Sequence, residues 1–271
     1  TTGSDGFLEV AGASANSNGN SNSNSSNLYG DVVACFVDFF TGQGGSVYPQ
    51  ETPFGGVCYL DFVRVRDGCR MRDFFTQLVE RPAVVLPCLG VALFQAKKLL
   101  FQQQGLELPA SLHTKKITVR LHNFEYHTPL RNLKSNLIGK FISIRGTVVR
   151  VGSIRPLLRS MAFLCKQCGT SVRKHVQDGK YAVPTRCPSP GCKSRSFTPD
   201  RSSAQTVDFQ KIRVQEIMGE DAGDAGRIPR TAECELAEDL VDSCVPGDEV
   251  KVCAIVKISG HDGDTGKGRR G

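Results

Sequence analysis

The chain has 271 residues, of which 39% are hydrophobic and 23% charged, and its formal net charge is +7. This length allows two or three domains. The sequence shows no apolar run that we expect to span a membrane, which favours a soluble protein. Eleven cysteines, an odd number with no secretory signal ahead of them, favour a reducing compartment over a disulfide-bonded secreted protein.

The positive charge is concentrated in the middle of the chain. Residues 111–215 hold 20 basic and only 4 acidic side chains, whereas residues 1–110 and 216–271 are both net negative. Such a concentration favours a polyanionic partner. A solvated basic surface that only keeps the chain soluble remains the alternative.

The N-terminal part of the chain divides into two segments. Residues 1–27 are dominated by Gly, Ala, Ser and Asn, and because this composition cannot bury enough apolar area to fold, we expect a disordered low-complexity leader without assigned function. Residues 28–110 carry apolar side chains mainly at helical spacing and predict a helical subdomain. Within it, residues 59–65 alternate as in a strand, and Pro87 and Gly90 predict a kink or a late start in the last helix.

Four cysteines between residues 161 and 197 form two close pairs, in the pattern C-x2-C-x18-C-x4-C. A tight turn at each pair, marked by Gly169 and Gly191, allows two thiolates to approach one ion from each side. Four sulfurs close the tetrahedral shell of Zn²⁺, so the spacing predicts a structural zinc site with no position for a catalytic water. The predicted ligands are Cys165, Cys168, Cys187 and Cys192.

Two disulfides or four unrelated thiols remain the alternative for these four cysteines. The other seven cysteines help to decide against disulfides, because several lie in apolar runs such as VACFVDFF and VKVCAIVKI. There a free cysteine behaves as a small buried hydrophobe.

After Pro109 the apolar period changes from helical to alternating. Short strands with Gly and Pro turns predict a small β-barrel of the OB type, whose open face commonly binds single-stranded nucleic acid. Gly146, midway along one strand, suits a bend or a bulge. The expected fold class is therefore α+β and multidomain: a helical subdomain and an OB-fold β-barrel with an inserted four-cysteine zinc-binding subdomain. We expect the barrel in residues 111–160 and 199–258, the insertion in 161–198, and a truncated basic hairpin or flexible tail in 259–271.

The end of the chain contains a partial match to a phosphate-binding loop. A Walker A loop needs G-x4-G-K-[ST], but His261 stands where the first glycine belongs and Gly268 replaces the hydroxyl that binds magnesium. We therefore expect no nucleotide site here. No Ser-His-Asp or Cys-His arrangement indicates catalysis either, so we predict no catalytic residues.

Several motifs together resemble the N-terminal region of the minichromosome maintenance helicases. These are RGTVVR at 145–150, the two cysteine pairs, QE at 215–216, IPR at 228–230, and DLVD followed by PGD between residues 239 and 248. The resemblance covers about residues 28–260. It implies a helical bundle, an OB-fold and a zinc insertion, arranged as one tier of a hexameric ring around single-stranded or double-stranded DNA.

The resemblance also implies partners and a cellular role. The ring would form by self-association or by alternation with the ninth family paralogue, and it would act in the nucleus in homologous recombination, crosslink repair and replication. The ATPase motor of the family lies downstream, with its ATP and Mg²⁺, so we expect this chain to bind and assemble without hydrolysing ATP. The full-length parent would be an ATP-hydrolysing DNA helicase. Residues 218–230 resemble the loop that communicates with that motor.

The expected DNA contacts are basic side chains. Arg150 and Arg155 flank a short turn between strands, where the loops of an OB-fold grip a backbone, and Lys211 and Arg213 alternate outward on a later strand. The resemblance adds the start of a hairpin that projects into the ring channel. Residues on or near it are Lys257, Lys267, Arg269 and Arg270. An ordinary surface charge remains the alternative for each of these residues.

Two other functions remain open. A non-motor module with an OB-fold and a zinc insertion, part of a replication or repair scaffold, would also bind single-stranded DNA. Motor motifs directly after residue 271 would exclude it. A zinc hydrolase is disfavoured because no water-bearing metal position is visible.

Overall fold

The structure, a computed structural model, describes the backbone of residues 7–10, 25–42, 56–71, 73–103, 105, 117–176, 183–217 and 228–258. The chain forms two compact units. One holds Gly146–Val250 together with the strand at residues 7–10, and the other, the helical unit, holds the described residues between 11 and 145 together with those from Lys251 onward. The domain boundaries expected from the sequence stay predictions. Most of the expected leader lies outside the described residues.

Helices dominate residues 25–103 and strands dominate residues 118–255, as expected, but the strand at residues 7–10 and the start of the first helix at Ser25 lie within the segment expected to be a disordered leader. The helices are α1 (Ser25–Thr41), α2 (Phe62–Gly68), α3 (Phe74–Glu80) and α4 (Pro82–Gln103), and the 3₁₀ turns are η2 (Leu130–Asn132), η3 (Ser135–Leu137) and η4 (Glu238–Leu240). The strands are β1 (Phe7–Val10), β2 (Val57–Asp61), β3 (Thr118–His122), β4 (Phe141–Val151), β5 (Arg155–Cys165), β6 (Ser171–His175), β7 (Phe197–Gln215), β8 (Thr231–Ala237) and β9 (Glu249–Ile255).

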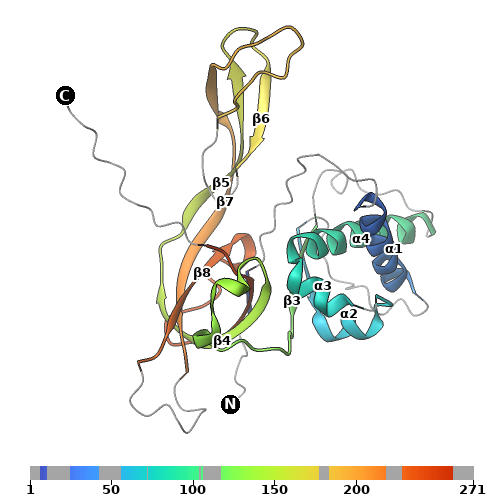
Figure 1. Cartoon of the computed structure of the whole chain (residues 1–271), viewed down its shortest axis with the longest axis vertical. Helices are drawn as coiled ribbons and strands as arrows, with labels where there is room; N and C mark the ends of the chain where they lie inside the picture. Colours follow the sequence, from blue (N-terminus) through green and yellow to red (C-terminus); the bar gives the residue numbers. More distant parts are fainter. Residues whose placement is uncertain are drawn as a thin grey trace, which may run out of the picture. The chain divides into compact units, whose positions relative to one another are not determined.

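The helical unit is organised around one apolar core. α1 packs along α4, and β2 and β3 form a two-stranded parallel sheet joined by α2, α3 and α4 (Figure 1). A cluster of aromatic rings fills the core: the Phe62 ring lies 4.7 Å from that of Phe124 and 6.0 Å from that of Phe74, within the range of favourable ring pairs. Many of the apolar side chains that lie at helical spacing in residues 28–110 are therefore core positions.

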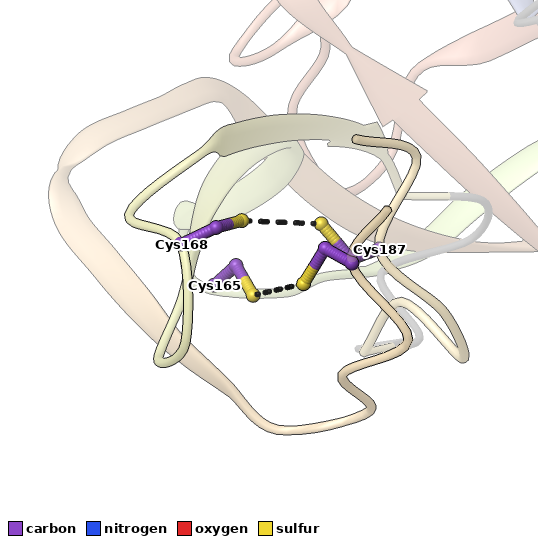
Figure 2. A group of neighbouring side chains, drawn as sticks. Cys165, Cys168 and Cys187 are labelled. Atoms are coloured by element: carbon purple, nitrogen blue, oxygen red, sulfur yellow. Dashed lines mark hydrogen bonds between the residues drawn. The ribbon is translucent and has the colours of Figure 1, made fainter. Parts of the chain in front are cut away.

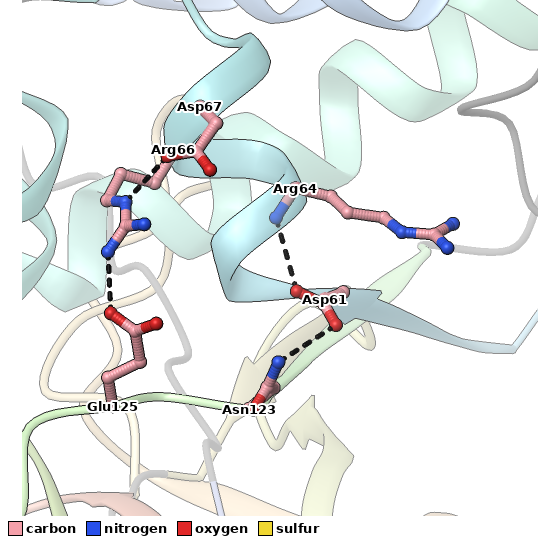
Figure 3. A network of polar contacts seen from close by, with 6 residues as sticks. All are labelled: Asp61, Arg64, Arg66, Asp67, Asn123 and Glu125. Carbon is pink, nitrogen blue, oxygen red and sulfur yellow. Dashed lines mark hydrogen bonds and ion pairs between the residues drawn. The ribbon is translucent and has the colours of Figure 1, made fainter.

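The strand expected at residues 59–65 is only half correct, because β2 ends at Asp61 and α2 begins at Phe62. The Asp61 carboxylate accepts a hydrogen bond from the Arg64 backbone N–H at 3.2 Å and one from the Asn123 amide at 3.2 Å (Figure 3). A side-chain oxygen at this position satisfies a helix N–H that has no partner within the helix. The capping bond therefore converts an alternating sequence into a strand followed by a helix.

The long helix α4 starts at Pro82 and runs through Pro87, so the late start expected from Pro87 is wrong. Proline at the first helical position costs no hydrogen bond, which explains where the helix begins. Gly90 has a packing reason, since a Cβ there would overlap the carbonyl oxygen of Ile117 just before β3. By length and composition α4 could cross a membrane, contrary to the expectation from the sequence, but ten of its residues are buried in its own unit, as in a core helix.

The second unit is built on an antiparallel sheet dominated by the long strand β7. The strand order is β1-β9-β4-β7-β5-β6, and β8 also pairs with β7. β4 and β8 flank the C-terminal part of β7 and curl into part of a barrel, while β5, β6 and the N-terminal part of β7 extend as an arm that carries the cysteine pairs (Figure 1). This is the expected barrel with its insertion.

The glycine within β4 has a different role from the one expected. A Cβ at Gly146 would overlap the Gln215 carbonyl oxygen and the Val214 side chain, so Gly146 allows β7 to approach β4 closely. The bulge itself lies three residues later, where the register shifts between Val148 and Arg150. This shift places Arg150 directly opposite Arg213 of β7.

Candidate metal centre and nucleic-acid interface

The four predicted cysteine ligands meet at one point. Their sulfur atoms all lie within 4.8 Å of one another, with 3.8 Å between Cys165 and Cys192 and 3.5 Å between Cys168 and Cys187 (Figure 2). A disulfide needs about 2.05 Å between sulfurs, so these four cysteines are free thiols. Four sulfurs about 2.3 Å from a central ion at tetrahedral angles lie about 3.8 Å apart. The Cys165–Cys192 separation matches this value, and the Cys168–Cys187 separation is slightly shorter. The cluster could therefore hold a metal ion.

Two tight turns place the sulfurs. Cys165 and Cys168 lie at the end of β5 and in the turn that follows it, which Gly169 closes at φ +70° while its N–H donates to the Cys165 carbonyl oxygen. In the second pair Gly191 has φ +82°, and the Cys192 N–H donates to the Ser189 carbonyl oxygen. Both glycines adopt the left-handed conformation that other residues rarely tolerate. The pairs are thus held in position by the local backbone.

The surroundings of the sulfurs lower the pKa values of Cys165 and Cys168 and raise those of Cys187 and Cys192. The Cys168 backbone N–H donates to the Cys165 sulfur and, with further donors, lowers the pKa of the Cys165 thiol to about 6. At Cys187 the Ser189 backbone N–H acts in the same sense, but burial and the neighbouring sulfurs outweigh it and raise the pKa to about 12. Four adjacent sulfurs cannot all carry negative charge without a cation between them, so a divalent ion is the group that fits this donor set.

Six of the remaining seven cysteines are buried. Burial raises the pKa of Cys58 to about 11 and that of Cys234 to about 12, so neither is a reactive thiolate. Other buried cysteines lie in the apolar cores, as the sequence predicts for small hydrophobes. These are Cys69, Cys88, Cys244 and Cys253.

The two arginines expected to flank a turn lie on one continuous edge of β7. β4 pairs with β7 up to Val151, β5 pairs with it from Arg155 onward, and between them the Gly152 N–H donates to the Lys211 carbonyl oxygen at 2.8 Å. Residues 152–154 are therefore a break within one edge and not a hairpin turn. Arg150 faces position 213 of β7 and Arg155 faces position 209, which are about 13 Å apart along the strand.

Three rows of side chains form one outward face, which we call the charged face. The first row is Arg150, Arg213 and Glu233, the second is Gly152, Lys211 and Glu235, and the third is Arg155, Phe209 and Ala237. Directly opposed residues share a face of a sheet, and positions 209, 211 and 213 alternate with the inward-facing Gln210 and Ile212. The structure thus brings together the four barrel residues predicted to contact DNA, which are Arg150, Arg155, Lys211 and Arg213.

Two of these four basic side chains are already paired. Arg213 contacts the Glu233 carboxylate at 2.9 Å and Lys211 contacts the Glu235 carboxylate at 3.5 Å. Sequence reasoning missed both glutamates. The signal was present, because Glu-x-Glu in β8 has the same alternation as Lys-x-Arg in β7, but only the pairing register reveals which charges meet.

A buried amide connects β7 to the residues around the charged face. Gln210 is 3% exposed; its Nε2 donates to the Gly152 carbonyl oxygen at 3.0 Å, and its Oε1 accepts from the Asp242 N–H at 2.9 Å. Both ends of the side chain are used, so the break between β4 and β5 is fixed relative to β7. Sequence reasoning also missed this residue.

Four further DNA contacts were predicted near the end of the chain. Lys257 is exposed two residues after β9 ends, in the other unit. Lys267, Arg269 and Arg270 lie outside the described residues, as does most of the loop at 218–230. The insertion carries further exposed basic side chains that sequence reasoning did not single out. These are Lys166, Arg173, Lys174, Arg186, Lys193 and Arg195.

The fold and the two sites define an OB-fold region, a class that commonly binds nucleic acid, with an arm whose four cysteines could hold a metal ion. Residues 129–260 match the MCM OB domain. The chain belongs to the minichromosome maintenance family, and it is similar to the N-terminal part of the eighth paralogue, as the sequence motifs indicate.

The relatives are DNA helicases. The chain is 45% identical over 242 residues to DNA helicase MCM8 of Xenopus tropicalis and 42% identical over 243 residues to that of Homo sapiens. Each match covers 84% of this chain and 29% of the relative. DNA helicase MCM8 of Gallus gallus is 48% identical over 196 residues, which cover 68% of this chain and 24% of the relative. The chain therefore spans less than a third of the length of these relatives.

Proposed function

We propose that this chain is the DNA-binding and ring-assembly N-terminal tier of a hexameric ATP-dependent DNA helicase. The observation that carries the proposal is the charged face on the MCM OB domain, where basic side chains from β4, β5 and β7 converge. Guanidinium groups hold phosphate oxygens bidentately and stack on bases, which suits a single strand lying across an OB-fold. The names of the relatives agree with this activity.

The metal in this proposal is Zn²⁺, held by Cys165, Cys168, Cys187 and Cys192. Thiolate ligands select zinc among the common structural ions, and four of them leave no coordination position for a reacting water. Zinc would hold the tips of the arm together, where the segment is too short to bury a core of its own. The arm would then serve contact between subunits.

The wider role follows the family. We place the parent protein in the nucleus, in homologous recombination, crosslink repair and replication, as a hexamer formed by self-association or by alternation with the ninth paralogue. ATP and Mg²⁺ would belong to the motor of the parent protein. This chain would then bind DNA and assemble without hydrolysing ATP.

Binding of a fluorescent oligothymidylate, followed by anisotropy over a series of salt concentrations, tests the DNA-binding part of the proposal. The wild-type chain is compared with Arg150→Ala/Arg155→Ala and with Arg64→Ala/Arg70→Ala, which removes the same charge from exposed positions of the helical unit. Affinity should fall steeply with salt, and the slope of the first variant should be shallower by up to about 0.7 for each lost phosphate contact. The control should keep the wild-type slope. Absent or salt-insensitive binding by the wild-type chain would contradict the proposal.

A further inference from the structure

The charged face is divided into two sides by the strands that build it. On the β8 side the two basic β7 residues of the charged face have carboxylate partners, Glu233 for Arg213 and Glu235 for Lys211. All four side chains are between 42% and 52% exposed, so both pairs lie at the surface. A phosphate that approaches this side meets two negative charges and must displace each carboxylate from its partner.

The β4/β5 side has a different character. Among the residues that the structure describes, Arg150 and Arg155 form no ion pair with a carboxylate, and the one polar contact of Arg155 is a hydrogen bond from its Nε to the Ser153 hydroxyl at 3.4 Å. The position between these arginines, opposite Lys211, is Gly152, which adds no side chain to this side and where a Cβ would lie only 2.9 Å from the Lys211 carbonyl oxygen. This side therefore offers two exposed arginines whose partner positions on β7 are about 13 Å apart along the strand.

We propose that Glu233 and Glu235 are specificity-determining residues of the charged face: they hold Arg213 and Lys211 away from the ligand and confine the phosphate backbone of a single strand to the Arg150–Arg155 edge of β7. This proposal rests on the proposed DNA binding. It deepens that function by separating the four basic residues into two that bind the backbone and two that are held in reserve by β8.

The electrostatics of Glu233 support this division. A hydrogen bond from Arg213 is the main cause that lowers the pKa of Glu233, and the positive charges of Arg213, Lys211 and Arg150 act in the same sense. Glu233 therefore stays ionised throughout the neutral range. The arginine of the β4 edge contributes to this effect, so removal of Glu233 would also leave Arg150 with a stronger field for phosphate.

A double-mutant cycle measures whether the glutamates hold the two basic residues in reserve. Oligothymidylate affinity is measured for the 271-residue chain, for Lys211→Ala/Arg213→Ala, for Glu233→Gln/Glu235→Gln, and for the combination of all four changes. In the wild-type background the loss of Lys211 and Arg213 should weaken binding by less than about twofold, because exposed ion pairs already occupy them. The two glutamine substitutions should tighten binding by about three- to tenfold.

The decisive comparison is the loss of oligothymidylate affinity caused by Lys211→Ala/Arg213→Ala, measured once with Glu233 and Glu235 present and once with both replaced by glutamine. Once the glutamates are gone, removal of the two basic residues should cost most of the three- to tenfold gain, because the freed side chains now contact phosphate. If the glutamine substitutions acted only through the overall electrostatic potential of the protein, Lys211→Ala/Arg213→Ala would reduce the affinity by the same factor in both backgrounds. Asp208→Asn is the matched control, since Asp208 is exposed on β7 and its alternation places it with Gln210 on the opposite face. It should change the affinity little.

The outcomes separate the inference from the function on which it rests. If the wild-type chain binds with salt dependence but the cycle is additive, or if losing Lys211 and Arg213 costs as much as losing Arg150 and Arg155, the division of the face is wrong while DNA binding stands. If neither the wild-type chain nor the glutamine variant binds, the proposed function fails and this inference fails with it. All substituted side chains are at the surface, so a thermal melt should show the same transition for each variant.

Discussion

A few polar side chains fix the geometry of both units. Gln210 uses its donor and its acceptor to join the break after β4 to the backbone of Asp242, and Asp61 ends β2 and caps α2. Asn123, which donates to Asp61, has φ 60°, a conformation that asparagine tolerates better than most residues. Each of these side chains stabilises the structure by a hydrogen bond, either to a residue that is distant in the sequence or to the backbone one helical turn away.

The cap at Asp61 predicts a measurable and pH-dependent loss of stability. Asp61→Ala should lower the free energy of unfolding by about 1 kcal/mol at neutral pH, whereas Asp61→Asn, which can still accept the N–H bond, should lose less. Burial alone would raise the pKa of Asp61, but the hydrogen bonds from the Arg64 N–H and from Asn123 outweigh it and lower the pKa. The stabilisation is therefore complete above about pH 4, the unfolded value, and is lost as the pH falls through the lower folded pKa. Urea unfolding at several pH values checks this, and a difference that grows on acidification would contradict it.

At the scale of elements, signals within short segments of sequence predicted most helices, strands and the cysteine turns. The pairing between strands that are distant in the sequence could not be predicted in this way. The cysteine spacing led directly to Cys165, Cys168, Cys187 and Cys192, because each pair closes within a single turn. The alternating stretches led to the strands of the barrel. The arrangement of β4 and β5 along one edge of β7, and the register that pairs Lys211 and Arg213 with β8, were missed because pairing partners are not encoded in any single segment.

The arm that carries the cysteines should depend on its metal. Cys187→Ser leaves three thiolates, so the content of bound zinc should fall from about one ion per chain to well below half, and the tip of the arm should become sensitive to protease. Assembly should weaken more than the affinity of the barrel for oligothymidylate. Cys35→Ser, which replaces a half-buried cysteine of α1 outside the cluster, is the control. Metal analysis by mass spectrometry with limited proteolysis checks the effect, and full zinc content with an intact arm in Cys187→Ser would count against this account.

At the scale of the whole chain, the aromatic core and the highest concentration of basic side chains lie mainly in different segments of the sequence. The helical unit buries its aromatic rings, and residues 1–110 are slightly acidic, whereas the segment from residue 111 to 215 concentrates the basic side chains, many of them on the barrel and on the arm. Two basic surfaces therefore compete as the place where DNA is held, the charged face and the exposed lysines and arginines of the arm. Long-range attraction acts through both, but direct phosphate contact needs the side chains to be unpaired and suitably spaced.

The location of bound DNA is the central claim, and amide hydrogen exchange of the 271-residue chain with and without oligothymidylate tests it most directly. The account predicts slower exchange in the presence of DNA in peptides that cover residues 150–155 and 209–213, and no change in peptides of α4. Slower exchange confined to β6 and the cysteine turns, or to the helical unit, with residues 150–155 unaffected, would contradict it.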